Sequence, residues 1–385
     1  MNSFLVTEWT DTVTGAKGYL ALDRVFDGVA GGGIRMKEGV SKEEVQRLAH
    51  TMTLKLMGLG MPIGGAKAGI DYPSNKADSK DVLYRFLEAH KPFLEQVWGA
   101  SEDLGTTKED IVRIVTQLGL ESPVDAFLYR MDSSTKEVIL NNLKESLSLN
   151  VDGVTITDLV TGLGVANSTL EALKSISLNP EEATVSIQGF GSVGASTAKY
   201  LNNAKVKIVS VSDVSGTLYN PEGLDVELLL KAKDEKGNIN RSLIPENYIQ
   251  SNRSDWLTYE VDVLIPAAIA DAINDENESQ IQAKLIVEGA NIPVTIEAEK
   301  QLFDRGILVV PDFIANSAGA GFFGTILYKG IGPDAYKIFD YLSNQVSSTT
   351  EWILRKAKEE NISPREAAVL FLDTNQVKIN VAENV

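Results

Sequence analysis

The segment ATVSIQGFGSVGASTAKYL, residues 183–201, decides the fold of this chain. Its first six residues form the short Val- and Ile-containing run that is typical of a buried parallel strand. Three glycines, Gly189, Gly191 and Gly194, follow in G-x-G-x-x-G spacing and open a helical pattern. A second strand pattern, VKIVSVSD, ends at Asp213. Strand, glycine turn, helix, strand and acid in this order predict a dinucleotide-binding βαβ unit.

Each part of this segment has a physical reason. The first glycine permits the tight turn, the second lets the backbone approach a pyrophosphate, and the third allows the helix to pack closely on the strand. The unpaired N–H groups and the dipole at the helix amino terminus favour phosphate, and the acid is placed to accept hydrogen bonds from ribose hydroxyls. The residues expected to bind the cofactor here are Gly189, Gly191, Ser192, Val193, Gly194 and Asp213.

The surroundings of Asp213 favour NAD over NADP. No basic residue follows Asp213 until Lys231, so nothing local is ready to pair with a 2′-phosphate. A more distant lysine could supply that charge, so NADP stays open. A triple-glycine match taken alone would equally describe a flexible turn, but the ordered strands and the acid favour nucleotide binding.

Five Val- and Ile-rich runs extend this unit into a larger α/β domain. They are ATVSIQ, VKIVSVSD, VDVLIPAA, AKLIVEGA and GILVVPD, each followed by a glycine, a turn or a helical pattern. We expect a doubly wound, Rossmann-type nucleotide-binding domain over residues 151–333, preceded by a connecting helix over 131–150. Residues 1–130 carry strand patterns and amphipathic helices, one of them over 77–97. The tail is helical, with a predicted buried face of Tyr336, Phe339, Leu342, Val346 and Trp352.

The composition suits an acidic globular protein and argues against several functions. Of the 385 residues, 43% are hydrophobic, and 53 acidic against 36 basic residues give a net charge of −17, which repels nucleic acid and anionic membrane surfaces. There is no cysteine, and the two histidines, His50 and His90, offer little for a metal site or a serine triad. No basic leader with an apolar core begins the chain and no apolar run is long enough to cross a bilayer, so we expect a cytoplasmic protein.

Two lysines stand in unusual surroundings. Lys67 lies in MPIGGAKAGIDYP among glycines and small apolar residues, with few acids near it in sequence, and Lys55 leans toward the apolar face of a helix expected to begin at Ser41. A desolvated ammonium loses its proton more readily, so such a lysine can act as a base. The glycines at 64, 65 and 69 are expected to let the substrate approach Lys67. The alternative is two solvent-exposed lysines beside a glycine turn, and for Asp103, in SEDLGTT, it is a helix cap.

Together with Lys55, Lys67 and Asp103, eight segments give the chain its resemblance to the glutamate/leucine/phenylalanine/valine family of amino-acid dehydrogenases. They run in family order: GGGIRM (31–36), LKLMGLGMPIGGAKAGIDYP (54–73), SEDLGTT (101–107), TGLGV (161–165), GFGSVG (189–194), VLIPAA (263–268), IVEGAN (286–291) and GILVVPDFIAN (306–316). A chance match of this extent is not credible, although some of the motifs are degenerate.

The resemblance implies a role for each matching residue. Lys67 matches the family's catalytic lysine, which activates the water that attacks an imino-acid intermediate, and Asp103 matches the acid that carries protons to and from the amino nitrogen. Lys55 matches the lysine that pairs with the substrate α-carboxylate. Hydride passes from Cα of an L-amino acid to the nicotinamide, and water then releases ammonium and a 2-oxo acid. The other implied positions are Gly32 and Asn316 for the substrate and Thr161, Ala267 and Asn291 for the cofactor.

Two positions separate glutamate from apolar substrates. The family's glutamate enzymes carry a lysine just before the GG-x-R segment and a serine seven residues after the PD…N asparagine, and here these positions are Gly31 and Phe323. Neither neutralises a carboxylate, so we expect an apolar L-amino acid as substrate. Glutamate dehydrogenase stays the first alternative, because a one-residue shift within SAGAGFFG would move Phe323 off the site. A simple amine as substrate, or a catalytically inactive nucleotide-sensing relative, are the others.

The resemblance also implies how the chain is organised. Residues 1–130 would form the substrate-binding and oligomerisation domain, completed by carboxy-terminal helices at 334–385, with the active site in the cleft between the domains. The expected partners are a small-molecule substrate and further copies of the chain in a homo-oligomer, and neither nucleic acid nor a membrane.

Overall fold

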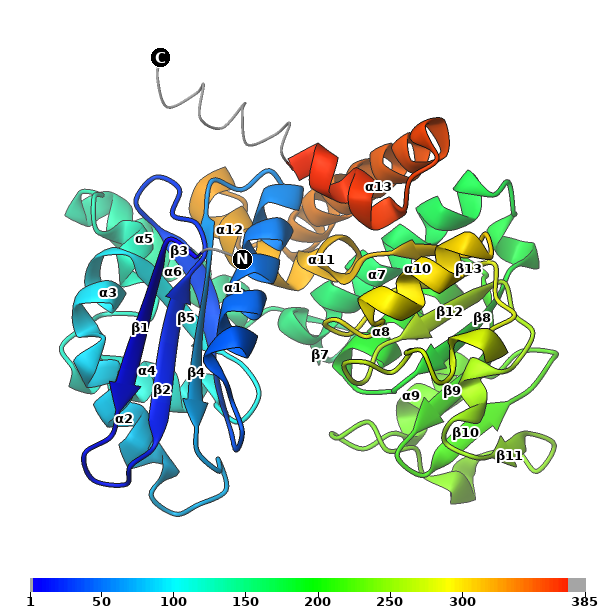
Figure 1. Cartoon of the computed structure of the whole chain (residues 1–385), viewed down its shortest axis with the longest axis horizontal. Coiled ribbons are helices and arrows are strands. Elements are labelled where there is room, and N and C mark those ends of the chain that lie inside the picture. Colours follow the sequence, from blue (N-terminus) through cyan, green and yellow to red (C-terminus); the bar gives the residue numbers. More distant parts are fainter. Residues whose placement is uncertain (1–2, 373–385) are drawn as a thin grey trace. The chain divides into compact units, whose positions relative to one another are not determined.

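The computed structural model describes residues 3–372, and the chain divides into two compact units. Unit 1 comprises residues 1–141 and unit 2 comprises residues 142–385. Each unit has its own β-sheet (Figure 1) and its own hydrophobic core. The expected fold class, two α/β domains of which the second has a Rossmann-type sheet, is confirmed.

Unit 1 is built on a five-stranded sheet of order β1-β2-β4-β3-β5. β2 pairs antiparallel with both β1 and β4, whereas β3 runs parallel to both β4 and β5. The strands are β1 Leu5–Thr10, β2 Lys17–Leu22, β3 Ala30–Lys37, β4 Gly64–Asp71 and β5 Trp98–Glu102. The helices are α1 Lys42–Gly58, α2 Ser79–Ala89, α3 Lys91–Gln96, α4 Lys108–Gln117 and α5 Asp125–Leu128.

The two faces of this sheet are covered by different helices. Ala66, Ala68 and Ile70 of β4 belong to a core shared with α2 and α4. α1 packs against β4, where Val45 and Ala49 of the helix are buried in a separate, smaller cluster. Because successive strand residues point to opposite faces, the odd-numbered residues of β4 face α1.

The amphipathic stretch at residues 77–97, expected as one helix, forms two. α2 ends at Ala89 and α3 begins at Lys91, with a proline, Pro92, in the first turn of α3. Proline has no N–H to donate and its ring clashes with the preceding turn, so a continuous helix breaks here.

Unit 2 carries a seven-stranded sheet of order β11-β10-β9-β8-β12-β13-β14. The five strands predicted from the sequence pair in parallel, and β10 and β11 extend the sheet in the antiparallel sense. The strands are β8 Thr184–Gln188, β9 Lys207–Asp213, β10 Gly216–Tyr219, β11 Ile249–Ser251, β12 Val263–Pro266, β13 Leu285–Val287 and β14 Leu308–Val310; β6 Asn150–Val151 and β7 Val154–Thr155 form a separate ribbon.

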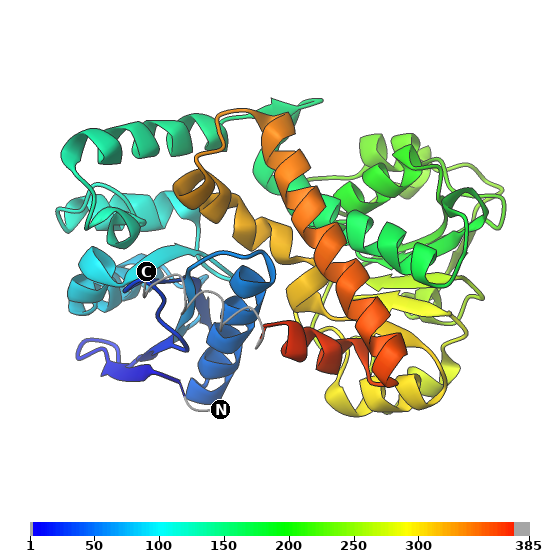
Figure 2. The same ribbon diagram turned by 90° about the horizontal axis from the view of Figure 1, so that it is seen from above.

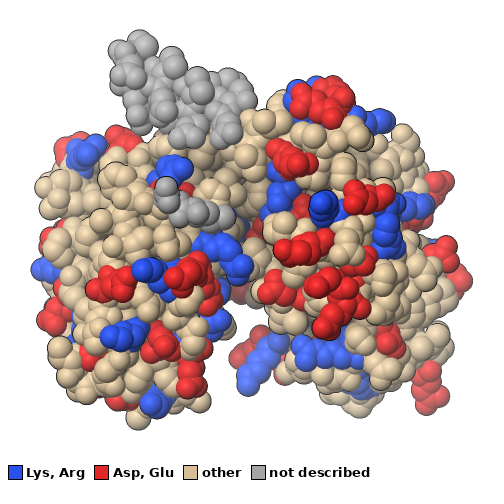
Figure 3. Space-filling model, in the orientation of Figure 1, with Lys and Arg blue, Asp and Glu red and all other residues tan. Residues whose placement is uncertain are grey.

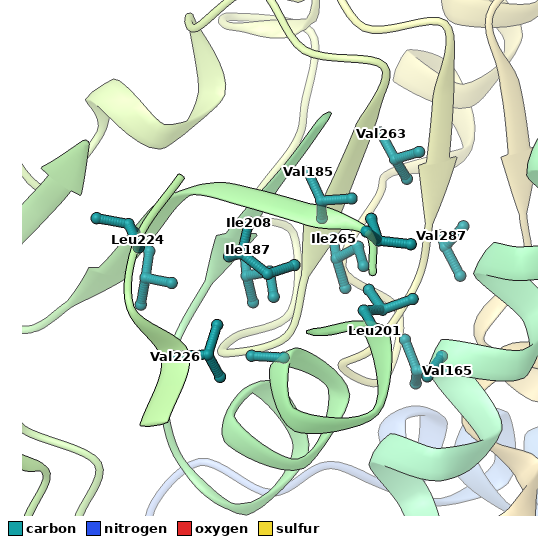
Figure 4. Packing of buried hydrophobic residues seen from close by; sticks show 14 of the residues in the cluster. Val165, Val185, Ile187, Leu201, Ile208, Leu224, Val226, Val263, Ile265 and Val287 are labelled. Atoms are coloured by element: carbon teal, nitrogen blue, oxygen red, sulfur yellow. The ribbon is translucent and has the colours of Figure 1, made fainter. Parts of the chain in front are cut away.

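Helices and a dense aliphatic core complete unit 2. The helices are α7 Ile156–Ser175, α8 Ser192–Asn203, α9 Val226–Ala232, α10 Ile296–Asp304, α11 Asp312–Ala315, α12 Ser317–Lys329 and α13 Ala335–Glu360, with short 3-10 turns at Pro180–Glu182, Arg241–Leu243, Asp255–Leu257 and Glu278–Gln280. Side chains of β8, β9, β12 and β13 meet Val165 of α7 and Leu201 of α8 (Figure 4). This packing fixes α8, and with it the glycine turn, on the sheet.

The carboxy-terminal helix belongs to unit 2. α13 packs along α7 and α12 (Figure 2). That carboxy-terminal helices from residue 334 also complete the first domain stays a prediction. Of its predicted buried face, Phe339, Leu342 and Val346 are buried, but Tyr336 is 70% exposed. The predicted connecting helix is α6, Ser133–Leu147, and the boundary between the units falls within it.

The surface carries charges of both signs. Acidic and basic side chains are interspersed on the face drawn in Figure 3, although acidic residues are in excess over the whole sequence. Within the described residues 3–372, every helix is too short or too polar to cross a membrane.

Candidate active site

Lys67 lies in the middle of β4 with 6% of its surface exposed. β4 is paired on both sides, with β2 and β3, and α1 packs against it. This burial rejects the alternative of a solvent-exposed lysine. Desolvation lowers the pKa of Lys67, and the negative charge of Asp103 opposes the shift without cancelling it.

Asp103 holds Lys67 in an ion pair. Its Oδ2 lies 2.9 Å from Lys67 Nζ and 2.8 Å from Arg35 Nε. Burial alone would raise the pKa of Asp103, but the charges of Lys67 and Arg35 and their hydrogen bonds outweigh it and lower the pKa to about 2. Few acids lie near Lys67 in the sequence, but the fold places Asp103, from the turn after β5, next to it.

The turn after β5 fixes the position of Asp103. The backbone N–H of Asp103 donates to Thr106 Oγ1 at 3.1 Å. Gly105 has a φ of +81°, and a Cβ there would lie 1.8 Å from Met36 O, so only glycine fits. Helix α4 is capped by Thr107, whose side chain accepts from the N–H of Asp110. Asp103 is therefore not the helix cap that was considered as its alternative role.

Arg35 belongs to this cluster, although the sequence analysis gave it no role. Besides its bond to Asp103, Arg35 NH1 donates to Glu44 Oε1 at 2.8 Å, and Lys37 Nζ lies 3.1 Å from the same oxygen. Glu44 stands in the first turn of α1, and its N–H donates to the cap residue Ser41 at 3.1 Å. The available signal was the place of Arg35 in GGGIRM, two residues after a run of glycines.

α1 lies close to β4 because glycines leave room for it. A Cβ on Gly65 would lie 2.2 Å from Ala49 O and from Thr53 N, and a Cβ on Gly69 would contact Val45 at 2.4 Å. The space in front of these glycines is filled by α1, so they serve helix packing and not the expected substrate approach. The same helix carries Lys55, which is 7% exposed and is therefore also no surface lysine.

The two positions expected to set substrate preference lie in different units. A Cβ on Gly32 of β3 would lie 1.7 Å from a carbonyl oxygen of β4, so no side chain fits there. A Cβ on the adjacent Gly31 would lie 3.2 Å from the ring of Phe127. Phe323 is half-buried on α12, and its ring makes an edge contact with the neighbouring Phe322 at 5.5 Å between ring centres.

The glycine turn of unit 2 has a backbone that requires glycine at two of its three predicted positions. Gly189 has a φ of +88°, and a Cβ on Gly194 would lie 2.0 Å from its carbonyl oxygen, so both positions need glycine. Gly191 caps α8, and a Cβ built on it meets nothing within 4 Å. The first turn of α8, with Ser192 and Val193, thus presents its N–H groups beside a position left open by glycine.

Asp213 ends β9 as expected, but its carboxylate is already bound within unit 2. Arg241 donates to its two oxygens at 2.8 and 2.9 Å, and the N–H groups of Ser215 and Ile239 each donate at 2.8 Å. These four bonds occupy the lone-pair positions of the carboxylate, so a ribose hydroxyl would have to displace one of them. Arg241 lies 28 residues after Asp213 and beyond Lys231, the first basic residue, so its pairing was not predicted.

The remaining predicted cofactor residues, together with Asn316, which was predicted for the substrate, gather at the carboxyl ends of the parallel strands. A Cβ on Gly189 would lie 3.1 Å from Ala267 O, which places Ala267 beside the glycine turn. Asn316 Nδ2 donates to Asn291 Oδ1 at 3.2 Å and to two backbone carbonyls of the same loop. Thr161 of α7 lies against the start of α12. Ligands of doubly wound sheets bind at this edge.

A buried charge cluster holds two of these loops together and was missed from the sequence. Glu288 precedes the loop of Asn291, and its Oε2 accepts from the N–H of Asp312 at 2.7 Å and pairs with Arg365 at 3.0 Å. Arg365 also pairs with Glu299. Burial raises the pKa of Glu288 to about 8, and the charges of Asp312 and Glu299 add to this rise while Arg365 opposes it. These residues are too far apart in sequence for spacing to reveal them.

Among the described residues, no group of His, Cys, Asp and Glu is arranged to hold a metal ion.

Both units match models of one known protein family. The family model Glutamate/Leucine/Phenylalanine/Valine dehydrogenase matches residues 153–376, and the model of the Glu/Leu/Phe/Val dehydrogenase dimerisation domain matches residues 3–118.

Several similar proteins are glutamate dehydrogenases. The one from Thermotoga maritima is 32% identical over 92% of this chain and 83% of the relative. A catabolic NAD-specific glutamate dehydrogenase of Bacillus subtilis is 29% identical over 92% and 81%, and an NADP-specific one of Saccharolobus shibatae is 33% identical over 75% and 65%. Hetero-hexameric glutamate dehydrogenase from Thermus thermophilus, in a Leu-bound form, shares the fold with a TM-score of 0.75 at 24% identity, over 97% of this chain and 88% of that chain.

Proposed function

The chain belongs to the glutamate/leucine/phenylalanine/valine dehydrogenase family, and on that premise we propose that it deaminates an L-amino acid with an apolar side chain. The products are a 2-oxo acid and ammonium, with NAD(P) as the hydride acceptor, and the reaction is reversible. The observation that carries the proposal is the buried pair of Lys67 and Asp103, in which a lysine with a lowered pKa is held by an ionised carboxylate.

The coenzyme supplies the hydride acceptor, and the residues of unit 2 fit it. The open position at Gly191 and the amino terminus of α8 suit the pyrophosphate. Asn291 is proposed to line the nicotinamide end, and Asn316, which donates a hydrogen bond to it, is proposed to face the substrate. The relatives include NAD-specific and NADP-specific enzymes. Because Asp213 is paired with Arg241, we propose both NAD and NADP as candidate coenzymes.

Lys67 is proposed as the general base. Its buried amine is deprotonated more easily than that of an ordinary lysine, so it can take a proton from the water that attacks Cα of the imino acid. A proton returned by Asp103 makes the nitrogen a leaving group, and the C–N bond breaks as the new hydroxyl loses its proton and becomes the carbonyl. The ammonia takes up the proton that Lys67 accepted from water and leaves as ammonium. Asp103 is ionised in the resting enzyme and orients the amine of Lys67. It relays protons by accepting one from the substrate nitrogen and later giving it back. Lys55 is proposed to pair with the α-carboxylate.

The apolar substrate is supported by the position that would meet the end of its side chain. Gly31 offers no charge, and it faces the phenyl ring of Phe127. A carboxylate buried there without a partner costs several kcal/mol, about a thousandfold or more in preference. Glutamate is the second candidate substrate, because the relatives named above act on it by name.

The wider setting of the enzyme follows from the family. We propose a homo-oligomer that assembles through unit 1, which the dimerisation-domain model matches almost throughout, and a cytoplasmic location. Sedimentation of the purified chain tests the assembly.

The test is coenzyme reduction over a panel of L-amino acids, with NAD and NADP assayed separately and the reverse reaction run from 2-oxo acids and ammonium. Turnover of valine, leucine or norvaline above glutamate supports the proposal. Turnover of glutamate alone refutes the apolar specificity, and no turnover of any amino acid with either coenzyme refutes the activity.

A further inference from the structure

One face of the β-sheet of unit 1 carries three neighbouring glycines. Gly31 and Gly33 lie two residues apart on β3, and Gly31 pairs with Gly99 on the neighbouring strand β5. We call these three residues the glycine strip. The strip faces the same side of the sheet as Lys67, because Gly31 pairs with Gly65 on the other neighbouring strand and residues two apart share a face.

The strip has a charged end. A Cβ on Gly33 would lie 3.1 Å from Cβ of Asp103, and Asp103 Oδ2 binds Lys67 and Arg35. Arg35 is the next residue of β3 on this face. The charges of Asp103, Lys67 and Arg35 therefore meet at this end of the strip.

The other end of the strip is aromatic. A Cβ on Gly31 would lie 3.2 Å from the ring of Phe127 and 3.6 Å from Ile63, and a Cβ on Gly99 would lie 2.2 Å from the same ring. The phenyl ring thus rests on two glycines of adjacent strands. Neither Phe127 nor Ile63 carries a side-chain hydrogen-bonding group or a charge.

Phe127 is fixed in this place by its own segment. The N–H of Ala100 in β5 donates to Pro123 O at 2.9 Å, which ties the approach to α5 onto the sheet. Asp125 accepts from the N–H of Glu121 at 2.9 Å, and Leu128 is buried. The ring is therefore part of a docked element and not a loop side chain that can swing away.

We propose that Phe127 is a specificity-determining residue that closes the far end of the substrate side-chain site. This rests on the proposed function. Gly33 and Gly31 are about 7 Å apart along the strand at roughly 3.3 Å per residue, so a substrate held at the charged end meets the ring after a side chain of moderate length. The substrate class is accordingly short and medium aliphatic amino acids, and neither glutamate nor the large aromatic ones.

The first test compares kcat/KM for alanine, valine, leucine, norleucine, phenylalanine and glutamate. The variants are Phe127→Ala, Phe127→Leu and, as a matched control, Tyr129→Ala, which removes an aromatic ring that is 59% exposed just beyond α5. We expect Phe127→Ala to raise the ratio of norleucine or phenylalanine to valine at least tenfold, since one methylene is worth about tenfold or more in an apolar site. Phe127→Leu should give a smaller shift in the same direction, and Tyr129→Ala should give none.

A second test uses the contact between Gly31 and the ring. Gly31→Lys should lower the thermal midpoint and the activity when Phe127 is present, because the new side chain starts against the ring. In the Phe127→Ala background the same change should be tolerated, and the ratio of glutamate to leucine should rise at least tenfold.

The outcomes separate the inference from the function. Turnover by the wild type with substrate ratios that stay within threefold in Phe127→Ala and Phe127→Leu, both folded by circular dichroism, would overturn the inference alone. Equal damage from Gly31→Lys with and without the ring would also overturn it. A wild type that turns over no amino acid overturns the proposed function and the inference with it.

Discussion

Replacing Asp103 by asparagine should lower the pKa of Lys67 further. The carboxylate lies 2.9 Å from Lys67 Nζ, and its charge is the main influence that keeps the amine protonated against burial. Asparagine preserves the shape of the side chain and removes the charge. Arg35 would then face Lys67 without a shared counter-ion, which acts in the same direction.

The size of the shift follows from the distance. Two unit charges 2.9 Å apart interact by about 1.4 kcal/mol in a medium as polar as water and by about 6 kcal/mol at an effective dielectric constant of 20. One pKa unit corresponds to about 1.4 kcal/mol. Because Asp103 is partly exposed, we expect a fall of at least about one unit and at most about four.

The pKa is read by NMR of the protein labelled with carbon-13 at lysine Cε, with Lys67→Arg to assign the signal, and by the pH dependence of kcat/KM. Since the base must be uncharged, the acid limb of the profile lies at the pKa of Lys67 and should move to lower pH in Asp103→Asn, while the maximal rate falls because the relay is lost. Glu44→Gln should give a smaller downward shift, and Arg35→Gln an upward one, because Glu44 raises and Arg35 lowers the pKa of Lys67. A pKa that is unchanged or raised in Asp103→Asn would refute the proposed electrostatics.

Two further predictions concern unit 2. Gly191→Ala should fold normally, because its Cβ meets nothing within 4 Å, but it should raise KM for the coenzyme. Gly194→Ala should instead lower the free energy of unfolding by roughly 1–3 kcal/mol or more. Equal urea midpoints for the two variants would contradict this prediction. Burial raises the pKa of Glu288 from its usual 4.5 to about 8, so the folded state binds more protons than the unfolded state between these values, and stability should fall as pH rises through this window. Glu288→Gln should flatten that fall in thermal midpoints measured from pH 5 to 9, and an equally steep fall in the variant would assign it to other groups.

Local patterns predicted much of this fold because the forces behind them are local. The glycine turn at Gly189 needs only its own backbone geometry, and the five parallel strands were recognised from their apolar runs. The same reasoning placed Tyr336 on the buried face of α13, where it is 70% exposed, since an apolar stripe says that a helix packs but not where its buried face ends. It also predicted α2 and α3 as one helix, although Pro92 interrupts the helix between them.

The site shows a similar division. The burial of Lys67 and Lys55 was foreseen from their apolar surroundings. The pairing of Lys67 with Asp103 and Arg35 depends on which strands lie side by side, and no spacing encodes that. The pairs of Arg241 with Asp213 and of Arg365 with Glu288 likewise join distant segments. The residues next to each acid in the sequence therefore did not reveal its partner.

The most direct test of the account is the turnover of wild type and Lys67→Ala on the best amino acid of the panel, at the pH optimum and with saturating coenzyme. Loss of a general base predicts a fall in kcat of about 10²–10⁴-fold or more, with coenzyme affinity unchanged because the glycine turn is untouched. A folded Lys67→Ala protein whose kcat stays within tenfold of the wild type would contradict the central claim.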